Sequence, residues 1–119
     1  MRPSTEPRHP RHGEVWLVDF NPGRGSEQKG VRPALVVQND VGNQYAATTI
    51  VAAITTTIKP YPVTVVIRAR TCGLPHDSMV NMAQLLTIDK TRLIKKLGEL
   101  TPELLAVANR ALRVSLDLT

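Results

Sequence analysis

Short apolar runs separated by polar, Gly- and Pro-rich breaks dominate the chain between residues 13 and 97. Most runs are about four to eight residues long, which is typical of β-strands. In the first run, Val15 and Leu17 point to one side while Trp16, Val18 and Phe20 point to the other, so both faces of that strand are apolar. We expect strands at residues 13–20, 34–38, 48–54 and 63–67, one or two more within 78–86, and a short one at 94–97.

One clear helix is expected at residues 101–116, where Thr101 can act as the N-cap and Pro102 suits the first turn. Its apolar side chains recur every four residues and form one stripe, made of Leu104, Leu105, Ala108, Leu112 and Leu116. Residues 39–43 form a turn with a short helical segment, and residues 89–92 a single helical turn. Many strands followed by one helix indicate a mainly β (α+β) fold, a small, partly open β-barrel with a C-terminal helix.

The chain of 119 residues has the length of one domain. Residues 1–12 contain three prolines and almost no apolar side chain, so we expect a disordered basic tail there and a folded domain at 13–119. The net charge is +5, and the tail, with Arg2, Arg8 and Arg11 against Glu6, supplies 3 − 1 = +2 of it. The remaining mild positive charge suits a nucleic acid or an acidic protein as partner.

The single cysteine, Cys72, excludes an internal disulfide. No apolar run approaches the ~20 residues that cross a bilayer, and the N-terminus lacks the apolar region of a signal peptide. We therefore expect a cytoplasmic protein without membrane association. Aromatic residues make up only 3% of the chain, which argues against an extended set of base-stacking rings.

Most common catalytic motifs are missing from the sequence. There is no Cys/His cluster with zinc spacing, no HExxH, no phosphate-binding loop, no dinucleotide fingerprint and no nucleophile elbow, so we expect neither a metal nor a cofactor. His76 is the only histidine in residues 13–119, which excludes an acid–base mechanism based on two histidines.

The polar segment 26–33 is the strongest remaining candidate for chemistry. Ser26 and Gln28 can donate hydrogen bonds to phosphates or bases, and Glu27 can accept a proton. Arg32 carries a planar fork of donors that matches two phosphate oxygens, and Pro33 restricts its backbone to an extended conformation. The residues alone support equally well a surface arginine that pairs with a nearby carboxylate.

Four stretches of the sequence, in order, resemble the MazF/PemK family of toxins from bacterial toxin–antitoxin pairs. They are the opening GEVWLVD at 13–19, GSEQ at 25–28 with RPALVVQND at 32–40, IVAAIT at 50–55, and Gln84 with TIDKTRL at 87–93. The resemblance implies an SH3-like, CcdB/MazF-like barrel that forms a homodimer. It also implies metal-independent cleavage of single-stranded RNA, mRNA included, at short motifs. In that reaction the 2′-OH attacks the adjacent phosphorus and leaves a 2′,3′-cyclic phosphate and a 5′-OH, and translation and growth stop.

The resemblance also assigns roles to individual residues. The family's catalytic pair corresponds to Arg32 and Thr55, and its RNA-contacting loop to Ser26, Glu27 and Gln28; Asn39, Asn43 and Gln84 correspond to positions that face the RNA or line its groove. Arg32 and Thr55 suit the stabilisation of charge on the phosphate oxygens. A guanidinium stays protonated near neutrality, so Glu27 is the alternative general base. Whether Thr56 or Thr57 assists Thr55 stays open.

The resemblance further implies an acidic, partly disordered MazE-like antitoxin that blocks the RNA groove. One departure concerns the cleavage motif: many relatives have Glu-Gln-[IV]-Arg where this chain has AQLL at 83–86, so a relative's motif cannot be transferred. Two alternatives remain at this point. A CcdB-like poison of DNA gyrase would act by protein–protein contact through a C-terminal helix, without an arginine–threonine pair. A non-catalytic RNA-binding barrel would leave RNA intact.

Overall fold

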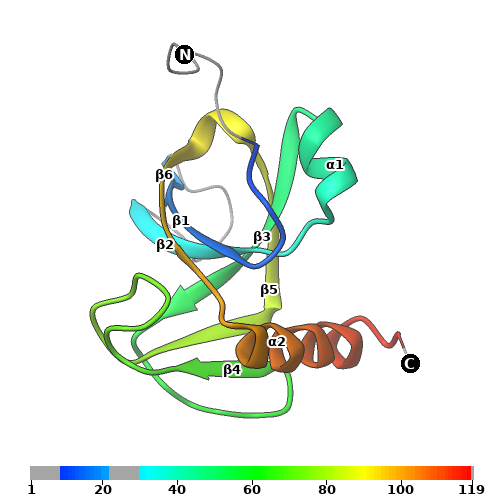
Figure 1. The fold of residues 1–119 in the computed structure, drawn as a ribbon. Helices are drawn as coiled ribbons and strands as arrows, with labels where there is room; N and C mark the ends of the chain where they lie inside the picture. Colours follow the sequence, from blue (N-terminus) through cyan, green and yellow to red (C-terminus); the bar gives the residue numbers. More distant parts are fainter. Residues whose placement is uncertain (1–8, 22–29, 119) are drawn as a thin grey trace.

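The computed structural model describes residues 9–21 and 30–118 (Figure 1). In chain order the elements are β1 (Glu14–Asp19), β2 (Val31–Val36), α1 (Asp40–Tyr45), β3 (Thr48–Thr55), β4 (Thr64–Ile67), β5 (Ser78–Asp89), the 3-10 turn η1 (Lys90–Arg92), β6 (Leu93–Glu99) and α2 (Pro102–Ser115). Neither α-helix in this part of the chain is long and apolar enough to cross a membrane.

The six strands form one antiparallel sheet in the order β4-β5-β3-β2-β1-β6. The sheet is strongly curved and forms a small barrel, whose wall consists of β6, β1, β2, β3 and the second half of β5 (Figure 1). The barrel stays open between β5 and β6. The expected mainly β, partly open barrel with a C-terminal helix is confirmed.

A bulge explains how β5 serves two parts of the molecule. Ala52 of β3 lies opposite Leu85, but the next residue, Ala53, lies opposite Asn81, so residues 82–84 of β5 are extra. Such an insertion bends a strand and increases its twist. The segment expected to hold one or two strands is therefore a single long strand, whose first half pairs with β4 and β3 and whose second half forms part of the barrel wall.

The two faces of the sheet carry separate cores. The helix-side core lies between the sheet and α2 and contains Val15, Leu35, Ala52, Ile54, Val65, Ile67, Val80, Met82, Ala108 and Ala111. The barrel core lies on the opposite face and contains Trp16, Val18, Phe20, Ala34, Val36 and Val51, with Leu86, Ile88 and Leu93 packed against them. The alternation predicted for the first strand is confirmed, because Val15 belongs to one core and Trp16, Val18 and Phe20 belong to the other.

Helix α2 begins where the sequence predicted: the Thr101 hydroxyl oxygen accepts the Leu104 N–H at 3.2 Å, and Pro102 is the first helical residue. The predicted stripe is wrong at its end, since Leu116 is 50% exposed and Ala111 is buried instead. A spacing of four residues advances about 400° around a helix of 3.6 residues per turn, so each step rotates the stripe by about 40°. After three steps Leu116 has turned away from the sheet.

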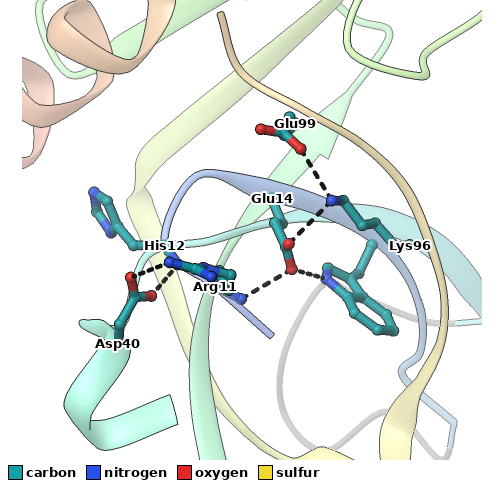
Figure 2. Close-up of polar contacts among 7 residues, drawn as sticks. Arg11, His12, Glu14, Asp40, Lys96 and Glu99 are labelled. Carbon is teal, nitrogen blue, oxygen red and sulfur yellow. Dashed lines mark hydrogen bonds and ion pairs between the residues drawn. The ribbon is translucent and has the colours of Figure 1, made fainter. Parts of the chain in front are cut away.

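Residues 9–12 differ from the solvated tail expected for them. Pro10 is fully buried, and the His12 ring places Nδ1 3.0 Å from the Val37 carbonyl oxygen and Nε2 2.7 Å from Asn109 Oδ1. The backbone N–H of His12 donates to Asp40 Oδ1 at 2.8 Å, the carboxylate that the Arg11 side chain also approaches (Figure 2). The segment thus joins β2, α1 and α2, while residues 1–8 of the expected tail lie outside the described part.

A buried carboxylate anchors the start of β1 (Figure 2). Glu14 is 8% exposed, and its Oε1 accepts the Arg11 backbone N–H and the Trp16 indole N–H, both at 2.9 Å. Its Oε2 lies 3.1 Å from Lys96 Nζ on β6, and Lys96 also donates to Glu99 Oε1 at 3.0 Å. The hydrogen bond to Glu99, followed by that to Glu14, raises the pKa of Lys96. The buried charge is thereby paired, as burial requires.

Candidate functional site

The sheet register places Arg32 and Thr55 on one face. Strands β2 and β3 pair Ala34 with Ala53, Leu35 with Ala52 and Val36 with Val51. Continued by two residues, this register aligns Arg32 with Thr55, and because side chains alternate, both lie on the face opposite the helix-side core. Two residues 23 positions apart in sequence are thus brought to neighbouring strand ends.

Thr55 is the last residue of β3 and is half-buried. Its hydroxyl oxygen accepts the Thr57 backbone N–H at 3.0 Å. That bond occupies a lone pair and leaves the hydroxyl hydrogen as a donor. Thr56 and Thr57 lie beyond the strand and are exposed, so Thr55 alone of the three combines a strand position with a fixed hydroxyl.

Arg32 extends from a rigid element. Strand β2 begins at Val31, three residues before the predicted start, and Arg32 pairs with Val18 of β1. The guanidinium-bearing side chain is exposed although its backbone is part of the sheet. A donor group on a paired strand is more precisely placed than one on a loop.

A closed neck, formed by Phe20, Asn21 and Gly30, joins the two ends of the loop that precedes Arg32. The Phe20 N–H donates to the Gly30 carbonyl at 2.9 Å, and the Gly30 N–H donates to Asn21 Oδ1 at 3.0 Å. The Arg92 guanidinium also donates to the Asn21 carbonyl oxygen. Three of the predicted site residues, Ser26, Glu27 and Gln28, belong to this loop and lie outside the described residues. The neck fixes the loop's ends two residues from Arg32.

Sequence reasoning did not single out Arg92, which braces this neck across 71 positions of sequence. Because Arg92 and Asn21 are far apart in the sequence, no local sequence pattern predicts their hydrogen bond. The only earlier signal was its place within the TIDKTRL stretch.

Asn43 requires a correction. It is 0% exposed, its Oδ1 accepts from Gln38 Nε2 at 3.0 Å and from the Thr49 hydroxyl at 2.7 Å, and its Nδ2 donates to the Gln38 carbonyl at 2.9 Å. A fully enclosed side chain whose carbonyl oxygen already accepts two hydrogen bonds lacks the exposure needed to bind RNA. The structure therefore assigns Asn43 to the scaffold that holds α1 against β3.

Asn39 and Gln84 occupy two different settings. Asn39 is exposed and caps α1, where its Oδ1 accepts the Gly42 N–H at 2.7 Å. Gln84 lies in the bulge of β5 and is half-buried. The bulge lies between Met82 of the helix-side core and Leu86 of the barrel core, so the alternation of side chains changes phase around Gln84. Across residues 9–21 and 30–118, no group of three or more His, Cys, Asp or Glu could hold a metal ion.

Comparisons with known proteins show which family the chain resembles. A family model described as PemK-like, MazF-like toxin of type II toxin–antitoxin systems matches residues 11–116. The protein named endoribonuclease EndoA from Bacillus subtilis is 44% identical over 110 residues, which cover 91% of this chain and 95% of that protein.

Two solved structures extend the comparison to the fold. An endoribonuclease from a mycobacterial species, solved in complex with its cognate antitoxin, superimposes with a TM-score of 0.78 at 29% identity and covers 92% of this chain and 97% of its own. The MazF structure from Deinococcus radiodurans superimposes with a TM-score of 0.77 at 27% identity, covering 93% and 99%.

Proposed function

The chain belongs to the PemK-like, MazF-like toxin family of type II toxin–antitoxin systems, and on that premise we propose that it is a toxin endoribonuclease that cleaves single-stranded RNA at a short sequence motif. The alignment of Arg32 with Thr55 on one face of the sheet carries this proposal. These residues offer a permanent positive charge and a fixed hydroxyl beside the neck of a polar loop. The CcdB-like alternative is not favoured, because the relatives found are endoribonucleases and MazF toxins.

The proposed reaction needs no metal. The ribose 2′-oxygen forms a bond to the adjacent phosphorus, its proton passes to a base, and the bond from phosphorus to the 5′-oxygen breaks. The leaving oxygen takes up a proton, so the products are a 2′,3′-cyclic phosphate and a 5′-OH. Negative charge grows on the non-bridging oxygens, where the Arg32 guanidinium and the Thr55 hydroxyl donate. One such preorganised donor contributes roughly 10²–10³ in rate.

We assign the removal of the 2′-OH proton to Glu27, since an arginine side chain is a poor base near neutrality. Glu27 belongs to the loop that the neck closes next to Arg32. Glu27→Gln keeps the size of the side chain and removes its basicity, so the single-turnover rate should fall while RNA affinity stays close to that of the wild type. An unchanged single-turnover rate would exclude this role.

The remaining parts of the proposal concern recognition. Ser26, Gln28, Asn39 and Gln84 are the proposed RNA-binding residues, with Asn43 withdrawn. We place the protein in the cytoplasm as a homodimer whose cognate partner is an acidic, MazE-like antitoxin. A solved mycobacterial relative is a complex of this kind, and the net charge of +5 on this chain suits an acidic partner.

A long RNA incubated with the purified protein in EDTA tests the proposal. We expect discrete fragments with 5′-OH ends, whose positions primer extension converts into the cleavage motif. Arg32→Ala and Thr55→Val should each slow the reaction by roughly 10²–10³ without changing the fold. Intact RNA, together with an Arg32→Ala protein that still arrests growth, would sink the proposal.

A further inference from the structure

Tyr61 is an exposed aromatic residue that is held in place from two directions. Its ring side chain is 47% exposed on the segment between β3 and β4. Its backbone N–H donates to the Thr64 hydroxyl oxygen at 3.0 Å, and its carbonyl accepts from the Thr64 N–H at 2.9 Å and hydroxyl at 2.7 Å. Pro60 and Pro62 restrict the chain on either side. The Tyr61 hydroxyl itself donates to Asn81 Oδ1 at 3.2 Å.

Asn81 places this tyrosine beside the candidate site. Asn81 lies opposite Ala53 of β3 and Thr64 of β4, and its neighbours Val80 and Met82 belong to the helix-side core. Its side chain therefore points to the opposite face, the one that carries Arg32 and Thr55. Thr55 follows Ala53 by two residues, so Asn81 and Thr55 are diagonal neighbours, roughly 7–8 Å apart.

The other aromatic residues are not available on this face. The chain has four, of which Trp16 and Phe20 are 7% and 8% exposed within the barrel core, while Tyr45 lies on α1 and is 79% exposed. Single-stranded RNA is held largely by the stacking of its bases on aromatic rings. A ring that is already fixed loses little conformational freedom on binding, which strengthens the contact it makes.

We propose that Tyr61 is the base-stacking platform of this site and that Asn81 is the positioning residue that fixes the ring. The stacked base belongs to a nucleotide close to the scissile phosphate, because Asn81 lies one diagonal step from Thr55. This inference rests on the proposed RNA cleavage and adds one recognition contact to it. A single ring binds any base, so Tyr61 contributes affinity, and sequence preference comes from other groups.

The test measures the binding of an uncleavable probe, a fluorescein-labelled oligonucleotide that spans the mapped cleavage site and carries 2′-deoxyribose at the cleaved nucleotide. Tyr61→Ala should weaken binding about 5- to 150-fold, the effect of losing one stacked base. Tyr61→Phe keeps the ring and Asn81→Ala keeps the tyrosine, so each should weaken binding less than Tyr61→Ala. Tyr45→Ala removes the other exposed tyrosine and should bind like the wild type.

In cleavage assays Tyr61→Ala should raise KM much more than it lowers kcat, because the ring does not touch the reacting atoms.

A second variant keeps the inference testable if Tyr61→Ala folds poorly. Tyr61→Trp should show quenched indole fluorescence when the probe binds, whereas the buried Trp16 gives a constant background in the wild type. Wild-type affinity in a folded Tyr61→Ala protein, or no quenching in Tyr61→Trp, would overturn the inference while leaving the proposed cleavage intact. Failure of the cleavage itself shows separately, as a wild-type protein that leaves long RNA uncut.

Discussion

At the residue scale, hydrogen-bonding capacity separates scaffold residues from site residues. Asn43 uses its carbonyl twice and its amide once within the protein, so it has a structural role. Thr55 uses a lone pair for Thr57, and its hydroxyl hydrogen is still able to donate. Both are polar residues to which the family resemblance gives a site role, and the sequence cannot distinguish them, because the difference lies in their spatial neighbours.

Asn43→Ala tests this distinction. The substitution leaves the Thr49 hydroxyl and the Gln38 amide without their buried acceptor. The free energy of unfolding, measured by urea denaturation, should fall by about 1–3 kcal/mol. The folded protein should still bind the RNA probe with wild-type affinity. A loss of affinity at unchanged stability would restore Asn43 to the RNA-binding residues.

The Lys96 ammonium predicts how stability depends on pH. Its hydrogen bonds to Glu99 and Glu14 raise its pKa in the folded protein above that in the unfolded chain. This contribution is fully present below the unfolded pKa of about 10.4 and is lost as pH rises through the folded value. Between roughly pH 9 and pH 11, the range around that pKa, the melting temperature of the wild type should therefore fall more than the melting temperature of Lys96→Met. Parallel decreases in the two proteins would contradict this.

At the element scale, the segment before β5 packs its backbone directly against β6. Arg70, Cys72 and Gly73 have positive φ values of 63°, 56° and 81°. A Cβ on Gly73 would lie 2.1 Å from the Leu97 carbonyl oxygen, and one on Gly98 would lie 2.4 Å from the Cys72 carbonyl oxygen. Two glycines on opposite sides of one contact therefore let the backbone of the β4–β5 segment lie directly against that of the edge strand β6.

Gly73→Ala combines a steric and a conformational cost, and Gly30→Ala is its matched control. Gly30 has a similar φ of 75°, but a Cβ there meets nothing within 4 Å. Gly30→Ala should cost about 1–2 kcal/mol of unfolding free energy, the penalty of left-handed backbone alone. Gly73→Ala should cost clearly more, as measured by denaturation of the two variants in parallel. Equal losses would show that the β6 backbone yields to the added methyl group.

Local sequence patterns predicted where each strand and the main helix lie, because apolar runs, glycines, prolines and the Thr101 cap act over a few residues. They did not predict the full length of β5, whose last residues Thr87–Asp89 are held by pairing with β3 rather than by an apolar pattern. The candidate site likewise depends on how neighbouring strands pair. Arg32 was conspicuous in sequence, but its alignment with Thr55 follows from the register of β2 and β3, and the link between Tyr61 and Asn81 from that of β4 and β5.

At the scale of the whole molecule, residues 9–12 connect parts that are distant in sequence. His12 reaches Val37 after β2 and Asn109 in α2, and Lys90 of η1 donates to the Ala46 carbonyl at 2.8 Å and lies 3.3 Å from His9 Nδ1. The N-terminal segment therefore links α1, α2, η1 and the residue after β2.

His12→Ala measures the strength of this connection. It removes two ring hydrogen bonds, to Val37 and Asn109, and should lower the free energy of unfolding by about 1–3 kcal/mol. His76→Ala, at an exposed position on the β4–β5 segment, should change it by less than about 0.5 kcal/mol. Both values come from urea denaturation at a pH where the wild type is fully folded. Equal stability of the two variants would mean that the ring of His12 does not hold the segment.

The closed neck of Phe20, Asn21 and Gly30 has an evolutionary consequence. Its hydrogen bonds are made by residues at the two ends of the loop and do not involve positions 22–29. Substitutions within those positions therefore do not remove any hydrogen bond of the neck itself. Under the proposed function, duplicated copies of such a gene can acquire new RNA targets through substitutions at loop positions other than Glu27, while Arg32, Thr55 and Glu27 retain the cleavage chemistry.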